Sequence, residues 1–332
     1  MYDRSRYPEG GSLEILLNMP VTPAETEKYR TFVQGKAADL RVFDYDPETL
    51  IWHYTNGAGL LGIVESASLR ATHVACVNDS SEVLYATRLF RSAVIALKEK
   101  SAADETATSF LEEVLKVTDE PAEMPSNAPS RFFITCFSEL EDDINQWLKY
   151  GGAHGENGYA IGFRARGLQI DPSTVVVRVN YDAKKHIEIA AETAEATVRF
   201  FLEGLQGNRI TDPEEWGKEF FEAWDNAIYR LSPLAKDECF TAEKEFRMIH
   251  ELQTTELPNV RFQQKQNLLA RYITLQSPAW MQTRTPILPI AKVMVGPGRH
   301  QGITQVSVRT LLNQMGYPGV EVSLSKRPVQ RP

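Results

Sequence analysis

Hydrophobic residues cluster along the chain in short runs that are rich in β-branched and aromatic side chains. Runs of this kind, bounded by Gly, Pro, Asn and Ser, are typical of β-strands. They predict strands at 50–55, 69–72, 132–138, 158–163, 174–181, 243–250, 271–275, 290–295 and 320–324.

Between these runs, apolar residues recur three and four positions apart, which indicates helices. Helices are predicted at 22–39, around 60–64, from 78 to about 97, at 104–117, through 144–148, twice within 184–230, and at 300–315. Thr22-Pro-Ala-Glu25 gives the first helix an N-cap and a proline at its first position, and Asp79 with Glu82 forms a capping pair for the third. Strands in close succession with helices grouped between them favour an α+β fold over a doubly wound parallel sheet.

The pattern suggests one elaborated domain rather than two. We expect an N-terminal extension at 1–45, a single α+β domain at 46–328 and a tail at 329–332. The acidic helices at about 184–232 have the character of a helical insertion between strands. The second of them contains Trp216, Phe220, Phe221 and Trp224.

Composition agrees with a chain that buries a core, because 42% of its 332 residues are hydrophobic. No stretch is long enough for a membrane span, and the N-terminus lacks the apolar core of a signal peptide, so we expect a cytoplasmic protein without membrane contact. Three cysteines without CxxC spacing argue against a disulfide framework and a thiolate zinc site.

The net charge of −8 is unevenly distributed. From Arg247 onward there are eleven Lys and Arg against three Glu, a net charge of +8, so the preceding residues carry −16. A basic C-terminal third is compatible with a phosphate-bearing partner, and equally with a surface that is merely solvated.

Familiar catalytic and nucleotide-binding motifs are absent from the sequence. There is no GxGxxG after a strand, no P-loop, no GxSxG and no HExxH, and the six histidines never pair at metal-ligand spacing. We therefore expect no metal.

Three separate patches carry candidate chemistry. The first is His53-Tyr54-Thr55, at the end of a predicted strand. A neutral histidine beside a hydroxyl can hydrogen-bond a ribose or an amide. The alternative is a strand-end histidine that is satisfied by the backbone.

The second patch begins with Thr135-Cys136-Phe137-Ser138, where another strand ends, and continues with Gln146, Trp147 and Tyr150. Trp147 and Tyr150 are three residues apart on one helical face and can stack on a planar ring. The alternative is that Trp147 is part of the core.

The third patch is a predicted strand in which Glu243, Glu245 and Arg247 alternate and so share one face. Two carboxylates and a guanidinium together are costly unless they are exposed, paired or used. The alternative is a salt-bridge ladder on an edge strand.

The order of these patches, with further motifs, resembles a largely bacterial family known as domain of unknown function 2971. The similarity extends from about residue 50 to residue 328. The matching motifs are His53-Tyr-Thr55, Asn78-Asp79…Glu82, Cys136-Phe-Ser138, Trp147…Tyr150, Gly158-Tyr-Ala-Ile-Gly-Phe163, Phe240…Glu243-x-Glu245-x-Arg247, Val295-Gly-Pro297 and Ser325-x-x-Pro328. The three-part order is also distantly similar to the ADP-ribosyltransferase superfamily, a likeness at the level of fold.

That likeness implies a split β-sheet core with flanking helices and an enzyme that uses NAD as co-substrate. The enzyme would cleave the nicotinamide–ribose bond and transfer ADP-ribose to a macromolecular acceptor, a protein or a nucleic acid, or to water. A bacterial defence or toxin role fits this reading.

The resemblance also implies residue roles. It gives His53-Tyr54-Thr55 the adenosine-side ribose and Ser138, with Trp147 or Tyr150, the nicotinamide. It implies that Glu245, or alternatively Glu243, contacts the nicotinamide-side ribose. Arg247 would orient Glu245 or contact the diphosphate.

Two other functions are compatible with the sequence. One is a non-catalytic module of the same fold that binds a nucleotide or nucleic acid through the basic C-terminal third. The other is a protein-interaction scaffold that uses Trp216 and Trp224 as surface anchors.

Overall fold

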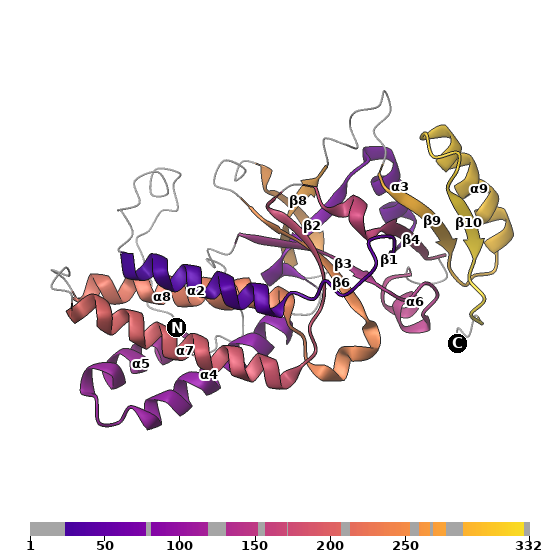
Figure 1. Cartoon of the computed structure of the whole chain (residues 1–332). Coiled ribbons are helices and arrows are strands. Elements are labelled where there is room, and N and C mark those ends of the chain that lie inside the picture. Colours follow the sequence, from indigo (N-terminus) through magenta and orange to yellow (C-terminus); the bar gives the residue numbers. More distant parts are fainter. Residues whose placement is uncertain are drawn as a thin grey trace.

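The computed structural model describes residues 24–77, 81–118, 131–151, 157–170, 172–206, 213–252, 259–265, 268–276 and 288–328. In these residues ten strands form one large, open sheet with helices packed against it (Figure 1). The strands are β1 (Leu50–Thr55), β2 (Leu69–His73), β3 (Phe132–Ser138), β4 (Tyr159–Arg164), β5 (Thr174–Arg178), β6 (Glu245–Glu251), β7 (Arg261–Lys265), β8 (Leu268–Leu275), β9 (Ile290–Val295) and β10 (Glu321–Leu324). The helices are α2 (Ala24–Leu40), α3 (Gly57–Ser66), α4 (Ser81–Lys100), α5 (Glu105–Thr118), α6 (Ile144–Tyr150), α7 (Ala183–Gln206), α8 (Pro213–Leu231) and α9 (Gln301–Gln314).

The sheet is mixed, which confirms the α+β class. Its order is β10-β9-β4-β1-β3-β2-β8-β7, and β6 and β5 branch from β3. Among the described strands, only β9 and β10 pair in parallel. Helices do not alternate with parallel strands here, and a doubly wound fold is therefore excluded for the described residues.

Strand β3 is the point at which the sheet divides. β6 pairs with its whole length, so β1 and β2 must share the other edge. β1 meets β3 only at Trp52 opposite Ser138, whereas β2 meets it at Ile134 and Phe133. The two strands therefore diverge along one edge of β3.

Cross-strand register determines which side chains share a face. Ser138 lies opposite both Trp52 and Glu245, so these three side chains project from the same face. On that face α2, α4, α5, α7 and α8 form a bundle over Ile134 and Ile249, and we call it the bundle face (Figure 1). α3 and α9 contribute to a second core on the opposite face.

Helix α2 and the helices at 183–231 make up much of the bundle. Tyr29 of α2 is 0% exposed and packs with α7 and α8, so the expected N-terminal extension is part of the core from residue 24 onward. The two helices expected within 184–230 are present as α7 and α8. Trp216 and Trp224 are only 3% and 0% exposed, so neither is available as the surface anchor that the scaffold reading requires.

Several local predictions differ from the structure: the strand expected at 174–181 ends at Arg178, and the strand expected at 271–275 begins at Leu268. Glu243 lies in a 3₁₀-helix (η5, Glu238–Glu243) rather than in β6, because Lys244 adopts a left-handed conformation (φ 44°) between them. Strand β7 was not expected, since its sequence RFQQK lacks an apolar run. The predicted capping residues Thr22, Pro23 and Asp79 and the tail at 329–332 lie outside the described residues.

Within the described residues, every helix is too short or too polar to cross a bilayer.

Candidate functional site

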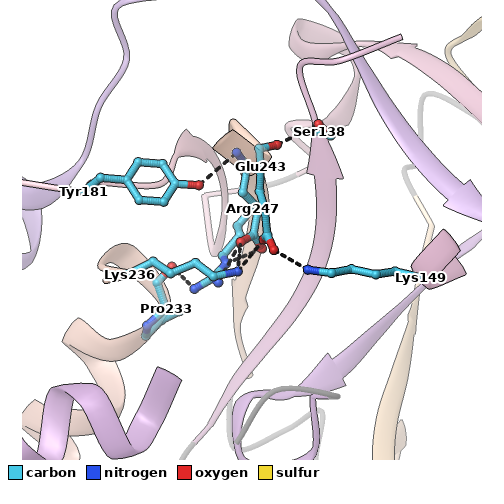
Figure 2. Close-up of polar contacts among 8 residues, drawn as sticks. Ser138, Lys149, Tyr181, Pro233, Lys236, Glu243 and Arg247 are labelled. Carbon is cyan, nitrogen blue, oxygen red and sulfur yellow. Dashed lines mark hydrogen bonds and ion pairs between the residues drawn. The ribbon is translucent and has the colours of Figure 1, made fainter. Parts of the chain in front are cut away.

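An ion pair between Glu245 and Arg247 lies at the centre of the candidate site. Both side chains project from β6 onto the bundle face. Arg247 donates from Nε to Glu245 Oε1 (2.8 Å) and from Nη2 to Oε2 (3.0 Å), and from Nη1 to the carbonyl oxygen of Pro233 (3.0 Å) (Figure 2). A planar guanidinium meets a carboxylate well in this two-point geometry.

Two lysines extend the pair into a larger group. Lys236 Nζ lies 2.9 Å from Glu245 Oε2 and 2.7 Å from Glu243 Oε2, and Lys149 Nζ lies 2.5 Å from Glu243 Oε1 (Figure 2). We call these five residues the charge cluster. It runs from fully buried Arg247 to the Lys149 side chain, which is 47% exposed.

The charge cluster keeps Glu245 ionised. Burial by itself would raise the pKa of this carboxyl, but the charges and hydrogen bonds of Arg247 and Lys236 outweigh it and hold the pKa well below the usual range. The Tyr181 hydroxyl accepts a hydrogen bond from the Glu245 backbone N–H (3.1 Å). Burial raises the pKa of Tyr181 to about 12, so its phenol stays neutral beside the cluster.

Cys136 marks the open side of the site. It lies opposite Arg247 in the β3–β6 register, so its side chain projects from the bundle face. This side chain is exposed, even though β3 is an interior strand of the sheet. Burial raises the pKa of Tyr150, and the nearby charges of Cys136, Glu245 and Glu243 raise it further. Tyr150, 40% exposed, therefore stands within electrostatic reach of the carboxylates.

Ser138 also lies beside the charge cluster, and its hydroxyl is already hydrogen-bonded within the protein. Its Oγ donates to the carbonyl oxygen of Glu243 (2.8 Å) and accepts from the N–H of Leu140 (3.2 Å) (Figure 2). Ser138 is 2% exposed, so it ties the end of β3 to the segment that carries Glu243.

Trp147 and Tyr54 are packing residues beside the site. Their rings meet edge to face with centroids 4.7 Å apart, and Trp147 is 5% exposed. Trp147 Nε1 donates to Asp142 Oδ1 (2.7 Å), and Tyr54 Oη donates to the carbonyl oxygen of Leu140 (2.6 Å). The alternative reading of Trp147 as core is confirmed, and Gln146 beside it is buried as well.

His53 and Thr55 are not brought to the charge cluster. Alternation along β1 places them on the face opposite Glu245, and the His53 ring packs edge-on against Phe137 (5.7 Å). His53 Nδ1 donates to the carbonyl oxygen of Cys136 (3.0 Å), and burial lowers the pKa of the ring, so it is neutral at pH 7. This is the backbone-satisfied histidine of the alternative reading.

Sequence reasoning missed Lys149, Lys236 and Tyr181. A signal for further cations was nevertheless present. Glu243 and Glu245 close together, with only Arg247 on the same predicted face to balance them, require another positive charge if they are buried. Nothing in the spacing indicates that Lys236, on the segment before η5, supplies it.

No family model, curated protein or solved structure shows significant similarity to this chain.

Proposed function

We propose that this protein is an ADP-ribosyltransferase-like enzyme that cleaves NAD, with the charge cluster at its centre. The observation that carries the proposal is the adjacency of three motif-bearing strands, of which β3 and β6 bring Ser138 and Glu245 to one face, whereas His53 and Thr55 of β1 lie on the other face and have no role in it. β3 lies between β1 and β6, and Glu245 projects beside the open position above Cys136. The order of the motifs along the chain, which is distantly similar to that of the ADP-ribosyltransferase superfamily, supports the same chemistry.

The proposed reaction breaks the bond between C1′ of the nicotinamide-side ribose and the nicotinamide nitrogen, which keeps the bonding electrons. Positive charge develops on the ribose and is then quenched when an acceptor nucleophile bonds to C1′ and loses its proton. Glu245, ionised because of Arg247 and Lys236, would accept a hydrogen bond from a ribose hydroxyl and stabilise this charge.

Other members of the charge cluster have supporting roles in the proposal. Arg247 is a positioning residue, because its guanidinium holds both oxygens of Glu245. Lys149 and Lys236 would bind the diphosphate, since an ammonium is a natural partner for phosphate. Tyr150, rather than buried Trp147, would stack on the nicotinamide ring, because it is the exposed aromatic residue of the pair.

Ligand binding in this proposal needs a local rearrangement. Glu245 is 6% exposed, and Lys236 bridges it to Glu243. Glu245 would open if Lys149 left Glu243, and Lys236 left both Glu243 and Glu245, to bind the diphosphate, while the pair with Arg247 stays intact.

The test is release of nicotinamide from NAD by the purified chain, alone and with protein or nucleic-acid acceptors. Glu245→Gln is expected to slow release by ~100-fold or more, as for loss of one preorganised electrostatic group. Glu48→Gln is the matched control, because Glu48 is an ion-paired carboxylate outside the cluster. Absence of release by the wild type under all these conditions, or an unchanged rate in Glu245→Gln, contradicts the proposal.

A further inference from the structure

The stretch between Glu256 and Glu321 contains no Asp or Glu, although it has seven Lys and Arg. Part of this stretch forms the β7–β8 hairpin, which contributes Arg261, Lys265 and Arg271. In a chain with a net charge of −8, an acid-free hairpin is a local concentration of positive charge.

Strand register gathers several of these groups on one face. Arg261 lies opposite Tyr272, which lies opposite Thr72 of β2, and Arg70 lies opposite Thr274. The Arg70 guanidinium lies 5.0 Å from the centroid of the Tyr272 ring and donates to Gln263 (3.2 Å). We call Arg70, Arg261, Gln263, Lys265 and Tyr272 the basic hairpin surface.

Among the described residues, no ion pair neutralises the three cations of this surface. In the part of the chain that the structure describes, no carboxylate lies within ion-pair distance of Arg70, Arg261 or Lys265. Lys292, from the same acid-free stretch, is by contrast paired with both Glu141 and Glu321.

Lys265 shows the excess of positive charge on this surface most clearly. Its Nζ reaches back to Thr72 Oγ1 (3.4 Å), and burial lowers its pKa, which the nearby thiols of Cys136 and Cys76 offset only in part. A partly buried ammonium in this position is better satisfied by an anion from outside the protein.

Aromatic rings accompany the cations. Tyr272 is partly exposed beneath Arg70, and Phe262 is 60% exposed on the other side of β7. β7 is the last strand in the sheet order of the described residues, so a ligand can reach both of its sides. Cations next to exposed rings on a strand surface suit single-stranded nucleic acid, because its bases offer free ring faces and its phosphates offer charge. A duplex keeps its ring faces stacked, and an acidic peptide has none.

We propose that the basic hairpin surface binds single-stranded nucleic acid, with phosphates on Arg70, Arg261 and Lys265 and bases against Tyr272 and Phe262. The surface shares the bundle face with Arg247 and Cys136 through the β8–β2–β3 register. The binding does not depend on NAD cleavage.

The test is fluorescence anisotropy with labelled single-stranded oligo-U and oligo-dT of about 20 nucleotides, long enough for one site. The double variant Arg70→Glu with Lys265→Glu is expected to weaken binding by ~10-fold or more and to flatten its salt dependence. Phe262→Ala, which leaves the charge unchanged, is expected to weaken binding by ~5-fold or more. Glu245→Gln is expected to bind as the wild type does, which separates this proposal from the proposed enzyme.

The matched control reverses two exposed cations outside the hairpin, Lys184→Glu with Arg299→Glu, and so has the same net charge as the double variant. Equal weakening in this control shows non-specific attraction and overturns the proposal. Absence of binding at low salt, or tighter binding of a duplex or of poly-glutamate than of single strands, overturns it too.

Discussion

Glu245 and Arg247, two residues apart on β6, form a two-point ion pair in which the arginine is completely buried. The arrangement is stable because each polar atom has a partner, including Pro233 O for Nη1 and Lys236 for Oε2. Removing one partner would leave an uncompensated buried charge, which costs far more than the pair contributes.

Arg247→Met is therefore expected to lower the free energy of unfolding by ~3–5 kcal/mol, a typical cost of breaking a buried pair from one side. Combining it with Glu245→Leu is expected to cost less than Arg247→Met alone, since no charge is then stranded. Urea denaturation measures both. Arg164→Met, which removes an exposed pair with Glu48, is the control and is expected to change stability by no more than about 0.5 kcal/mol. Additive effects of the two cluster substitutions would contradict this account.

The lowered pKa of Glu245 gives the stability a defined pH dependence. The folded state favours the ionised carboxylate of Glu245, which therefore adds to the free energy of unfolding. This stabilisation is complete above the unfolded-state pKa of about 4.3 and is lost as the pH falls through the lower pKa of the folded state. The difference in unfolding free energy between wild type and Glu245→Gln is expected to be constant from neutral pH to about pH 5 and to shrink below that. A difference that grows on acidification would contradict the direction of the shift.

Most individual helices and strands follow from the local sequence pattern. Which elements pack against one another does not. The run Phe132–Ser138 predicts β3 closely, and the capping motif Thr22-Pro-Ala-Glu25, with an expected end near Asp39, predicts α2 closely. The capping motif predicts the helix that contains Tyr29, but nothing in the sequence shows that Tyr29 packs against α7 and α8, far along the chain. The helix therefore looked peripheral in sequence although it is central in space.

The candidate site shows the same limit. Alternation alone places His53 and Tyr54 on opposite faces of β1, but only the pairing of Trp52 with Ser138 reveals which of them shares a face with Glu245. Cross-strand register is a long-range property, and one residue of slippage exchanges every side chain between faces. Sequence reasoning therefore found the three motif-bearing strands and Glu245, but not that Glu243 lies outside β6, nor which aromatic residue remains open.

Trp147 and Tyr150 are expected to respond oppositely to substitution. Trp147→Phe loses the bond to Asp142 and part of the contact with Tyr54, so it is expected to lower stability by ~1–3 kcal/mol with KM for NAD unchanged. Tyr150→Ala is expected to leave stability nearly unchanged and to raise KM for NAD by ~5-fold or more, as for loss of one stacked ring. Thermal melts and steady-state kinetics distinguish the two. A raised KM in Trp147→Phe at unchanged stability would reverse these roles.

Cys136 offers a reporter for the location of the site that does not depend on turnover. Cys136 and Cys239 are exposed, whereas Cys76 is buried, so a thiol-reactive maleimide is expected to label the first two. In a Cys239→Ser variant, labelling reports on Cys136 alone. Because Cys136 lies beside Arg247 on the bundle face, NAD bound to the charge cluster would cover it.

Saturating NAD is therefore expected to slow maleimide labelling of Cys136 by ~10-fold or more, the protection that a covered side chain shows when opening is rare. The matched control is Cys136→Ser, in which labelling of Cys239 is expected to be insensitive to NAD. Mass spectrometry of a tryptic digest identifies the labelled cysteine in each case. Equal labelling rates with and without NAD in the Cys239→Ser variant would place the ligand away from β3 and contradict the assignment of Glu245. Protection of both cysteines would indicate a general closing of the molecule instead of NAD bound at the charge cluster.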